Sequence, residues 1–416
     1  VEVIRLASVC FSIATLPVIY ILAESLFGHR VGALAAFLLA ISPLHILFAQ
    51  EARMYTMFAF FTGLGFFFFW KAWSRDRWSD WLLFSLSMTA AFYTHSLAIF
   101  ILLAIDVFCL TQLSQLKERW KGLTASHAAI FLLFLPWALM MFQQLPRLQN
   151  EFAGSEQTIA TLIETLVVFL FGYSLQPNMI PVALFFALVL IAFILLALWH
   201  LFRRKGGDLP GILLALCISV IPVIGVFFMS YVTPVFVIRR LLPASLGLIL
   251  LASWTIIKAK PKWINYAAGA SVVVLMALSL VNYYQHPDDL KIPFHKIIEE
   301  LQLEVNENAV FVHATNTSAL AFAYYAPELN SDFLEGDPDY LAETNRGRAQ
   351  RIAGLIPAQI DEITGDSDVF WLIVVMDHNL EYQQQIVDQF DSDFTRLQHL
   401  TIHDVDILQY SISPSG

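Results

Sequence analysis

The sequence predicts a polytopic α-helical membrane protein with about ten transmembrane helices and a C-terminal extracytoplasmic α/β domain. Of its 416 residues, 58% are hydrophobic and only 14% are charged, whereas soluble domains carry about 25% charged residues. The apolar residues form long runs before residue 286, and acidic residues dominate after it. The 35 Phe, 13 Tyr and 10 Trp also exclude a disordered chain, because so much apolar surface does not stay in water.

Charge divides the chain into two parts. Residues 1–286 hold 18 Lys and Arg against 11 Asp and Glu, and residues 287–416 hold 6 against 23. Apolarity ends and prolines appear between residues 284 and 293, as at a boundary between domains. We therefore predict a transmembrane domain at 1–286 and an acidic, water-exposed domain at 287–416.

Ten apolar runs predict the membrane spans. A span needs about 20 mostly apolar residues. The predicted spans are 6–26, 31–48, 54–73, 80–94, 96–112, 124–142, 179–201, 210–231, 237–257 and 263–281. The run 80–112 is long enough for two of them and is divided at His95 and Ser96. An eleventh run, 159–175, is shorter and is interrupted by Glu164.

Basic loops orient these spans, because Lys and Arg of short loops collect on the cytoplasmic side. Ten spans place five basic loops on one face: His29-Arg30, Lys71/Arg75/Arg77, Lys117/Arg119/Lys121, Arg203-Arg204-Lys205 and Lys258/Lys260/Lys262. A full span at 159–175 would move the last two loops to the other face. We therefore predict an interfacial or re-entrant helix there on the outer face, and the acidic domain outside.

The same orientation places residue 1 outside the membrane, directly before a span. No basic leader precedes that span. We expect at least one further N-terminal span before this chain.

The outer ends of the spans carry the candidate site. Polar groups at a bilayer are costly, so their placement indicates function. Arg53, Arg239 and Arg240 lie at outer span ends, against the positive-inside rule. A guanidinium binds phosphate bidentately, so three on one face predict a pocket for an anionic substrate. For any one arginine alone, snorkelling or a pair with Glu51 explains it equally well.

Other polar residues admit similar pairs of interpretations. Tyr55, His95 and Tyr231 lie near the same ends, where His95 would orient a substrate hydroxyl or phosphate; a lone histidine there is more often a satisfied helix-end group. Asp106 lies in the middle of a span, so we expect it to pair with a neighbouring helix.

Cofactor motifs are absent from the sequence, which has no glycine-rich phosphate loop, no HExxH and no CxxC. Asp337-Pro338-Asp339 matches the Asp-x-Asp pattern of metal-bound nucleotide-sugar sites, but this pattern arises readily by chance in an acidic loop. We predict no cofactor and no metal-binding residues, and a divalent cation stays an open alternative. Nucleic acid is not expected as a partner, because the acidic outer domain would repel it.

The C-terminal domain has an α/β pattern. Apolar runs at 309–314 and 369–376 predict buried strands, and 394–400 and 405–410 predict edge strands. Helical patterns occupy 295–305, 318–325 and 381–391. We expect this domain to recognise an acceptor or to cover an outer cleft.

Three segments resemble a known family. Residues 5–60, which include QEARMY at 50–55, resemble the second to fourth spans of GT-C membrane glycosyltransferases. The branch is that of bacterial proteins similar to dolichyl-phosphate-mannose–protein mannosyltransferases and to the lipid A aminoarabinose transferase (glycosyltransferase family 39-like). YTHSLAIF at 93–100 and PVFVIRRLLPASLGLILLA at 234–252 match later segments in the expected order. The resemblance covers residues 1 to about 284.

The resemblance implies a multi-pass enzyme of a bacterial or archaeal plasma membrane. Such an enzyme moves a sugar from a polyprenyl-phosphate-linked donor at the outer leaflet to a protein, lipid or glycan acceptor, by inverting displacement. An acidic residue of a first outer loop is the family's base, and that loop would precede Val1. Glu51 is the nearest acidic match within the chain. Arg239 corresponds to the arginine of the family's Arg-Tyr segment, and Arg240 replaces the tyrosine.

Two other functions remain open from the sequence. A transporter or flippase for a lipid-linked anion would share the outer arginines, but it would show an inverted repeat, which the sequence does not display. A non-catalytic membrane scaffold would use the acidic domain to bind a partner.

Overall fold

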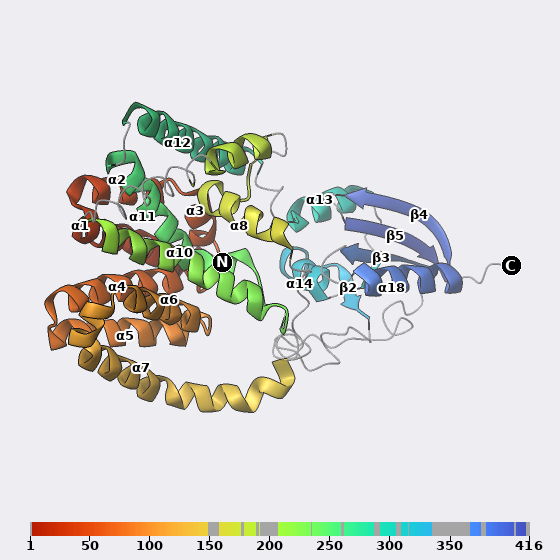
Figure 1. Cartoon of the computed structure of the whole chain (residues 1–416). Helices are drawn as coiled ribbons and strands as arrows, with labels where there is room; N and C mark the ends of the chain where they lie inside the picture. The colour runs from red at the N-terminus through yellow and green to blue at the C-terminus, as the bar shows by residue number, and fades with distance from the viewer. Residues whose placement is uncertain are drawn as a thin grey trace. The chain divides into compact units, whose positions relative to one another are not determined.

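The computed structural model describes residues 2–148, 158–175, 179–188, 191, 207–233, 235–258, 262–286, 292–304, 309–314, 316–334, 367–375, 380–402 and 405–412. The chain forms two compact units (Figure 1). The first comprises Val1–Gln143 with Gly154–Pro287, and the second comprises Gln144–Ala153 with Asp288–Gly416.

The first unit is helical. Its described elements are α1 (Glu2–Phe27), α2 (His29–Ala40), α3 (Pro43–Ala49), α4 (Tyr55–Arg75), α5 (Trp78–Thr94), α6 (Ala98–Thr111), α7 (Leu113–Leu148), α8 (Ile159–Phe171), α10 (Leu209–Met229), the 3₁₀ helix η2 (Ile238–Leu241), α11 (Leu242–Lys258) and α12 (Lys262–Gln285).

Helix α11 forms the centre of this unit. It packs against α2, α4, α8, α10 and α12, and all of its residues from Leu242 to Ile256 are buried. Gly247 allows the backbones of α10 and α11 to approach, because a Cβ atom there would lie 2.5 Å from the carbonyl oxygen of Ala215. A helix that is apolar all round is buried in this way.

Five described helices have the length and apolarity of a membrane span: α1, α7, α10, α11 with η2, and α12. The pair α2–α3 makes a sixth if it is counted as one span. The predicted span 31–48 corresponds to this pair, in which α2 and α3 are bent by 57° relative to each other. Pro43 begins α3, and the side chain of Ser42 caps it by accepting from the backbone N–H of His45. Proline disfavours a helical conformation in the residue before it, so the first helix ends there.

The remaining predicted spans are resolved to different extents. The predicted division of 80–112 at His95 is confirmed, since α5 ends at Thr94 and α6 begins at Ala98. Helix α8 is 13 residues long, about 20 Å, which is short for a hydrocarbon core of about 30 Å and agrees with an interfacial helix. Within the predicted span 179–201, residues 189, 190 and 192–201 lie outside the described residues. The count of ten spans therefore stays a prediction.

Asp106 pairs across a helix interface, as predicted. Its Oδ1 atom lies 3.0 Å from Nε2 of His127, which joins α6 to α7. The contact with His127 therefore gives the Asp106 carboxylate a polar partner within an otherwise apolar helix.

The second unit contains a five-stranded sheet in the order β2-β1-β3-β5-β4. Strand β1 is parallel to β2 and β3, whereas β5 is antiparallel to β3 and β4. The elements are α13 (Phe294–Glu304), β1 (Val310–His313), α14 (Asn316–Tyr325), β2 (Asn330–Phe333), β3 (Val369–Val375), α18 (Leu380–Asp393), β4 (Thr395–Ile402) and β5 (Val405–Ser411).

Helices cover both faces of this sheet. On one face, Phe370 and neighbouring strand residues pack against Phe390 and its neighbours in α18. On the other, Phe311 and Trp371 pack with residues of α13 and α14. Burial on both faces explains why β1 and β3 are continuous apolar runs in the sequence.

The α/β prediction for this unit is confirmed, with two corrections. Strand β2 was missed, because its four residues NSDF are short and mostly polar. The prediction of an edge strand at 405–410 is wrong, because β5 lies between β3 and β4. Its buried residues lie on both faces, with Leu408 and Tyr410 in one core and Val405 and Ile407 in the other, and local sequence does not show which strands flank it.

Candidate functional site

The connection between α3 and α4 carries two of the predicted site residues, Glu51 and Arg53. Gln50 anchors its start, since Tyr283 donates to Gln50 Oε1 at 2.9 Å and Gln50 Nε2 donates to the Tyr284 hydroxyl at 3.3 Å. The Ser8 hydroxyl of α1 donates to the carbonyl oxygen of Arg53 at 3.1 Å. Contacts to α1 and α12 therefore hold this connection in place.

The helix η2 carries Arg239 and Arg240 directly before α11. Arg240 donates from Nη1 to the carbonyl oxygen of Val235 at 3.1 Å. Electrostatic repulsion from Arg239 and Arg53 acts on Arg240, and Tyr55 lies close enough to interact with it as well. The structure thus brings the three predicted arginines together, although almost 190 positions separate Arg53 from Arg240 in the sequence.

Arg239 has an unused hydrogen-bond donor. Its Nε atom is buried and has no partner among the residues that the structure describes. A buried donor without an acceptor costs about 1–3 kcal/mol, more when the group is charged. A site with such a donor is suited to an anionic ligand that brings its own oxygen atoms.

His95 lies at the break between α5 and α6. Its Nδ1 atom accepts from the backbone N–H of Leu97 at 3.2 Å, and its ring stacks on Phe58 with 5.3 Å between the ring centroids. Burial, and then the nearby Arg240 guanidinium, lower the pKa of His95 to about 4. His95 is therefore neutral at pH 7, and its proton on Nε2 can donate to a ligand.

Tyr173, which the sequence analysis missed, also belongs to this group. It follows α8, and the charges of Glu164, Arg239 and Glu51 all act on its phenol group. Glu51 lies close to Tyr283 as well. No motif marks Tyr173; the only signal was its place within 159–175, the segment predicted as an interfacial or re-entrant helix on the outer face. We call Arg53, Arg239, Arg240, Glu51, Tyr55, His95 and Tyr173 the arginine cluster.

The predicted substrate-positioning tyrosines differ in their surroundings. Tyr55 is buried at the start of α4, where its ring meets Phe48 at 5.3 Å between centroids. Tyr231 is 66% exposed, and its ring packs on Phe227 of the preceding helix. Tyr231 therefore stays a prediction, since its described contacts do not involve the arginines.

The guanidinium groups of the arginine cluster can bind an anion, and the Glu51 carboxylate can accept a proton. The guanidinium groups of Arg53, Arg239 and Arg240 lie close enough to interact electrostatically, and the charges of Arg239 and Glu51 both act on Tyr173. Among the residues that the structure describes, no three His, Cys, Asp or Glu side chains are grouped as a metal site. Asp337 and Asp339 lie outside the described residues.

The N-terminal third of the chain matches a family model. Residues 1–139 match the model described as dolichyl-phosphate-mannose-protein mannosyltransferase. This segment runs from α1 into α7 and contains Glu51, Arg53, Tyr55 and His95. No curated protein sequence matches the chain.

Solved structures share the fold over nearly the whole chain. ArnT from Cupriavidus metallidurans in the apo state has a TM-score of 0.60 at 13% identity, over 99% of this chain and 84% of that one. The same protein bound to undecaprenyl phosphate gives 0.56 at 13% identity, over 99% and 85%. The Archaeoglobus fulgidus oligosaccharyltransferase in complex with Zn and sulfate gives 0.50 at 11% identity, over 98% of this chain but only 61% of that one. The predicted resemblance to GT-C glycosyltransferases is confirmed.

Proposed function

We propose that this protein is a multi-pass membrane glycosyltransferase of the GT-C type, which transfers a sugar from a polyprenyl-phosphate-linked donor to an acceptor. The arginine cluster carries this proposal, above all the buried Nε atom of Arg239 that lacks a partner among the described residues. A lipid phosphate supplies the oxygen atoms such a donor needs. The ArnT structure with undecaprenyl phosphate shows that this fold accommodates a ligand of that class.

The arginines act on the leaving group. In the displacement, the acceptor oxygen forms a bond to the anomeric carbon while the bond from that carbon to the phosphate oxygen breaks. Negative charge develops on the departing polyprenyl phosphate, and fixed guanidinium groups of Arg53, Arg239 and Arg240 stabilise it. Attack from the face opposite the leaving group inverts the configuration of the anomeric carbon.

A carboxylate must take the proton of the acceptor hydroxyl. Glu51 is the carboxylate that the α3–α4 connection holds in the arginine cluster, and we assign it to this proton. Neutral His95, together with Tyr55 and Tyr231, would position the hydroxyl groups of the sugar.

The donor is lipid-linked, and the acceptor is a protein, lipid or glycan. A plasma membrane of a bacterium or archaeon, with the C-terminal unit outside, fits this chemistry. The alternatives of a transporter and of a scaffold are less favoured, because the fold follows ArnT over 99% of the chain.

Reconstituted full-length protein tests the proposal. Transfer from labelled polyprenyl-phosphate sugars is measured for Arg239→Ala, Arg239→Lys and the exposed control Arg75→Ala. Loss of one charge-assisted contact of about 1.5–3 kcal/mol reduces transfer about tenfold to hundredfold in the alanine variant, with partial recovery in the lysine variant. Unchanged transfer in Arg239→Ala, or movement of intact donor across the bilayer without sugar transfer, would contradict it.

A further inference from the structure

The chain turns sharply where α8 ends. Gly172 has φ 73° and ψ −170°, a conformation that is essentially limited to glycine. A Cβ atom at this position would lie 2.7 Å from Cβ of Pro43, at the start of α3. Gly172 therefore packs directly against the helix that leads into the Glu51–Arg53 connection.

A second contact holds the chain just beyond this turn. The side-chain amide of Asn282 in α12 donates to the carbonyl oxygen of Ser174, which is itself buried. Tyr173 thus lies between two anchored residues, one held by α3 and one by α12. These two contacts fix the backbone on either side of Tyr173, and therefore the point from which its side chain extends.

The surroundings keep this phenol protonated. Burial, and then the negative charge of Glu164, raise the pKa of Tyr173, with a smaller contribution in the same direction from Glu51. Arg239 acts in the opposite direction and does not outweigh them. At neutral pH, Tyr173 is therefore a neutral O–H donor beside a guanidinium that is suited to an anion.

We infer that Tyr173 is a positioning residue of the donor site, whose phenol hydroxyl donates a hydrogen bond to the phosphate group that Arg239 holds. This inference rests on the proposed function. The hydroxyl adds a directional contact to the charge attraction of the arginines, and so fixes the phosphate relative to the sugar.

Binding of two probes to the full-length protein in detergent micelles tests this role. The probes are undecaprenyl phosphate and undecaprenol, which differ only in the phosphate group. Tyr173→Phe removes the hydroxyl and keeps the ring. We expect its affinity for undecaprenyl phosphate to fall at least tenfold, and its affinity for undecaprenol to stay that of the unmodified protein. Tyr266→Phe, on the exposed side of α12, is the matched control and should change neither.

Two outcomes overturn the inference. Unchanged binding of undecaprenyl phosphate by Tyr173→Phe shows that the hydroxyl makes no contact with the phosphate, and equal loss of both probes shows that the hydroxyl has only a structural role. Binding of the same probes by Arg239→Ala shows whether only the role of Tyr173 fails or the proposed function fails as well. If that variant retains full phosphate binding, the arginine cluster is not the donor site and both proposals fail. If it loses binding while Tyr173→Phe does not, only the role of Tyr173 fails.

Discussion

Nε2 of His45 lies 3.0 Å from Oγ of Ser245, so one buried hydrogen bond joins α3 to α11 across 200 positions of the sequence. The Ser245 hydroxyl donates to the carbonyl oxygen of Leu242 at 2.7 Å, so its proton is used. His45 must therefore donate from Nε2. The bond ties the helix before the Glu51–Arg53 connection to the helix that follows Arg239 and Arg240.

Loss of this bond should destabilise the first unit. Ser245→Ala leaves a buried N–H of His45 without an acceptor, and we expect the free energy of unfolding in micelles to fall by about 1–3 kcal/mol. Ser253→Ala is the matched control, because Ser253 is equally buried in α11 and bonds only to Ile249 of the same helix. Equal effects of the two substitutions would show that the bond to His45 adds nothing.

The pair of Asp106 and His127 should show coupling in a double-mutant cycle. Asp106→Ala, His127→Ala and the double variant are compared by denaturation in micelles. Interhelical polar pairs in membrane proteins contribute on average about 0.6 kcal/mol and at most about 1.7, so we expect a coupling free energy of about 0.5–1.7 kcal/mol. Strictly additive losses would mean that the 3.0 Å contact does not hold α6 to α7.

Gly172→Ala should weaken donor binding from a distance. Alanine is strained in this conformation by about 1–3 kcal/mol, and its methyl group meets Pro43. The turn must then shift and carry Tyr173 with it, which lowers the affinity for undecaprenyl phosphate. Gly207→Ala is the control, since an added Cβ there has no atom within 4 Å. Normal binding by Gly172→Ala would rule out a fixed position for Tyr173.

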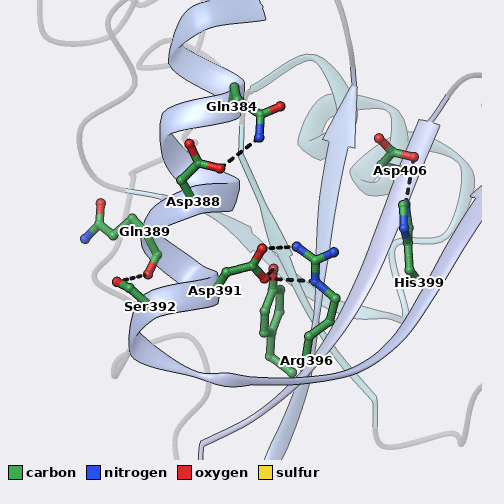
Figure 2. Close-up of polar contacts among 9 residues, drawn as sticks. Gln384, Asp388, Gln389, Asp391, Ser392, Arg396, His399 and Asp406 are labelled. Atoms are coloured by element: carbon green, nitrogen blue, oxygen red, sulfur yellow. Dashed lines mark hydrogen bonds and ion pairs between the residues drawn. The ribbon is translucent and has the colours of Figure 1, made fainter.

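Acid should loosen the second unit at Asp391 (Figure 2). Arg396 Nε and the Tyr410 hydroxyl each donate to Asp391 Oδ1 at 2.8 Å. Partial burial raises the pKa of Asp391, but the hydrogen bonds from Arg396 and Tyr410 outweigh it and hold the pKa below its ordinary value. The unfolded chain therefore takes up this proton first, so the stabilisation is complete above about pH 4 and is lost as the pH falls through the folded pKa.

Hydrogen exchange of the β5 amides in the full-length protein measures this effect. Asp391→Asn should exchange faster at neutral pH and should lose part of the acid dependence. The effect is modest, because the Asp391 side chain is 38% exposed and solvent screens it. Asp388→Asn is the control, since Asp388 accepts only a local bond from Gln384 in the contacts shown in Figure 2. A larger effect at position 388 would contradict the prediction.

The orientation of the chain can be tested with a reporter fused after Gly416. The five basic loops hold 13 of the 24 Lys and Arg residues, and the positive-inside rule places them in the cytoplasm. We expect a reporter that works only outside the cytoplasm to be active at this end. Activity of a cytoplasm-only reporter instead would reverse the predicted topology.

Local sequence determined much of the architecture. Apolar runs were enough to locate α1, α10, α11 and α12, because burial in lipid or in a helical core imposes the same uninterrupted apolarity. Strands β1 and β3 were located for a related reason, since both of their faces are covered. The break at His95 and the pairing of Asp106 could also be predicted from single residues, because a polar side chain within an apolar run needs a helix end or a polar partner.

Only the tertiary structure decided which distant residues meet. The position of β5 inside the sheet depends on its pairing with both β3 and β4, a choice that no alternation pattern records. Arg53, Arg239 and Tyr173 come together because α3, α8 and α11 pack side by side, with Gly172 against Pro43 and His45 bonded to Ser245. Hydropathy is a property of each segment alone, whereas these contacts are made between segments, so packing, and not composition, assembles the site.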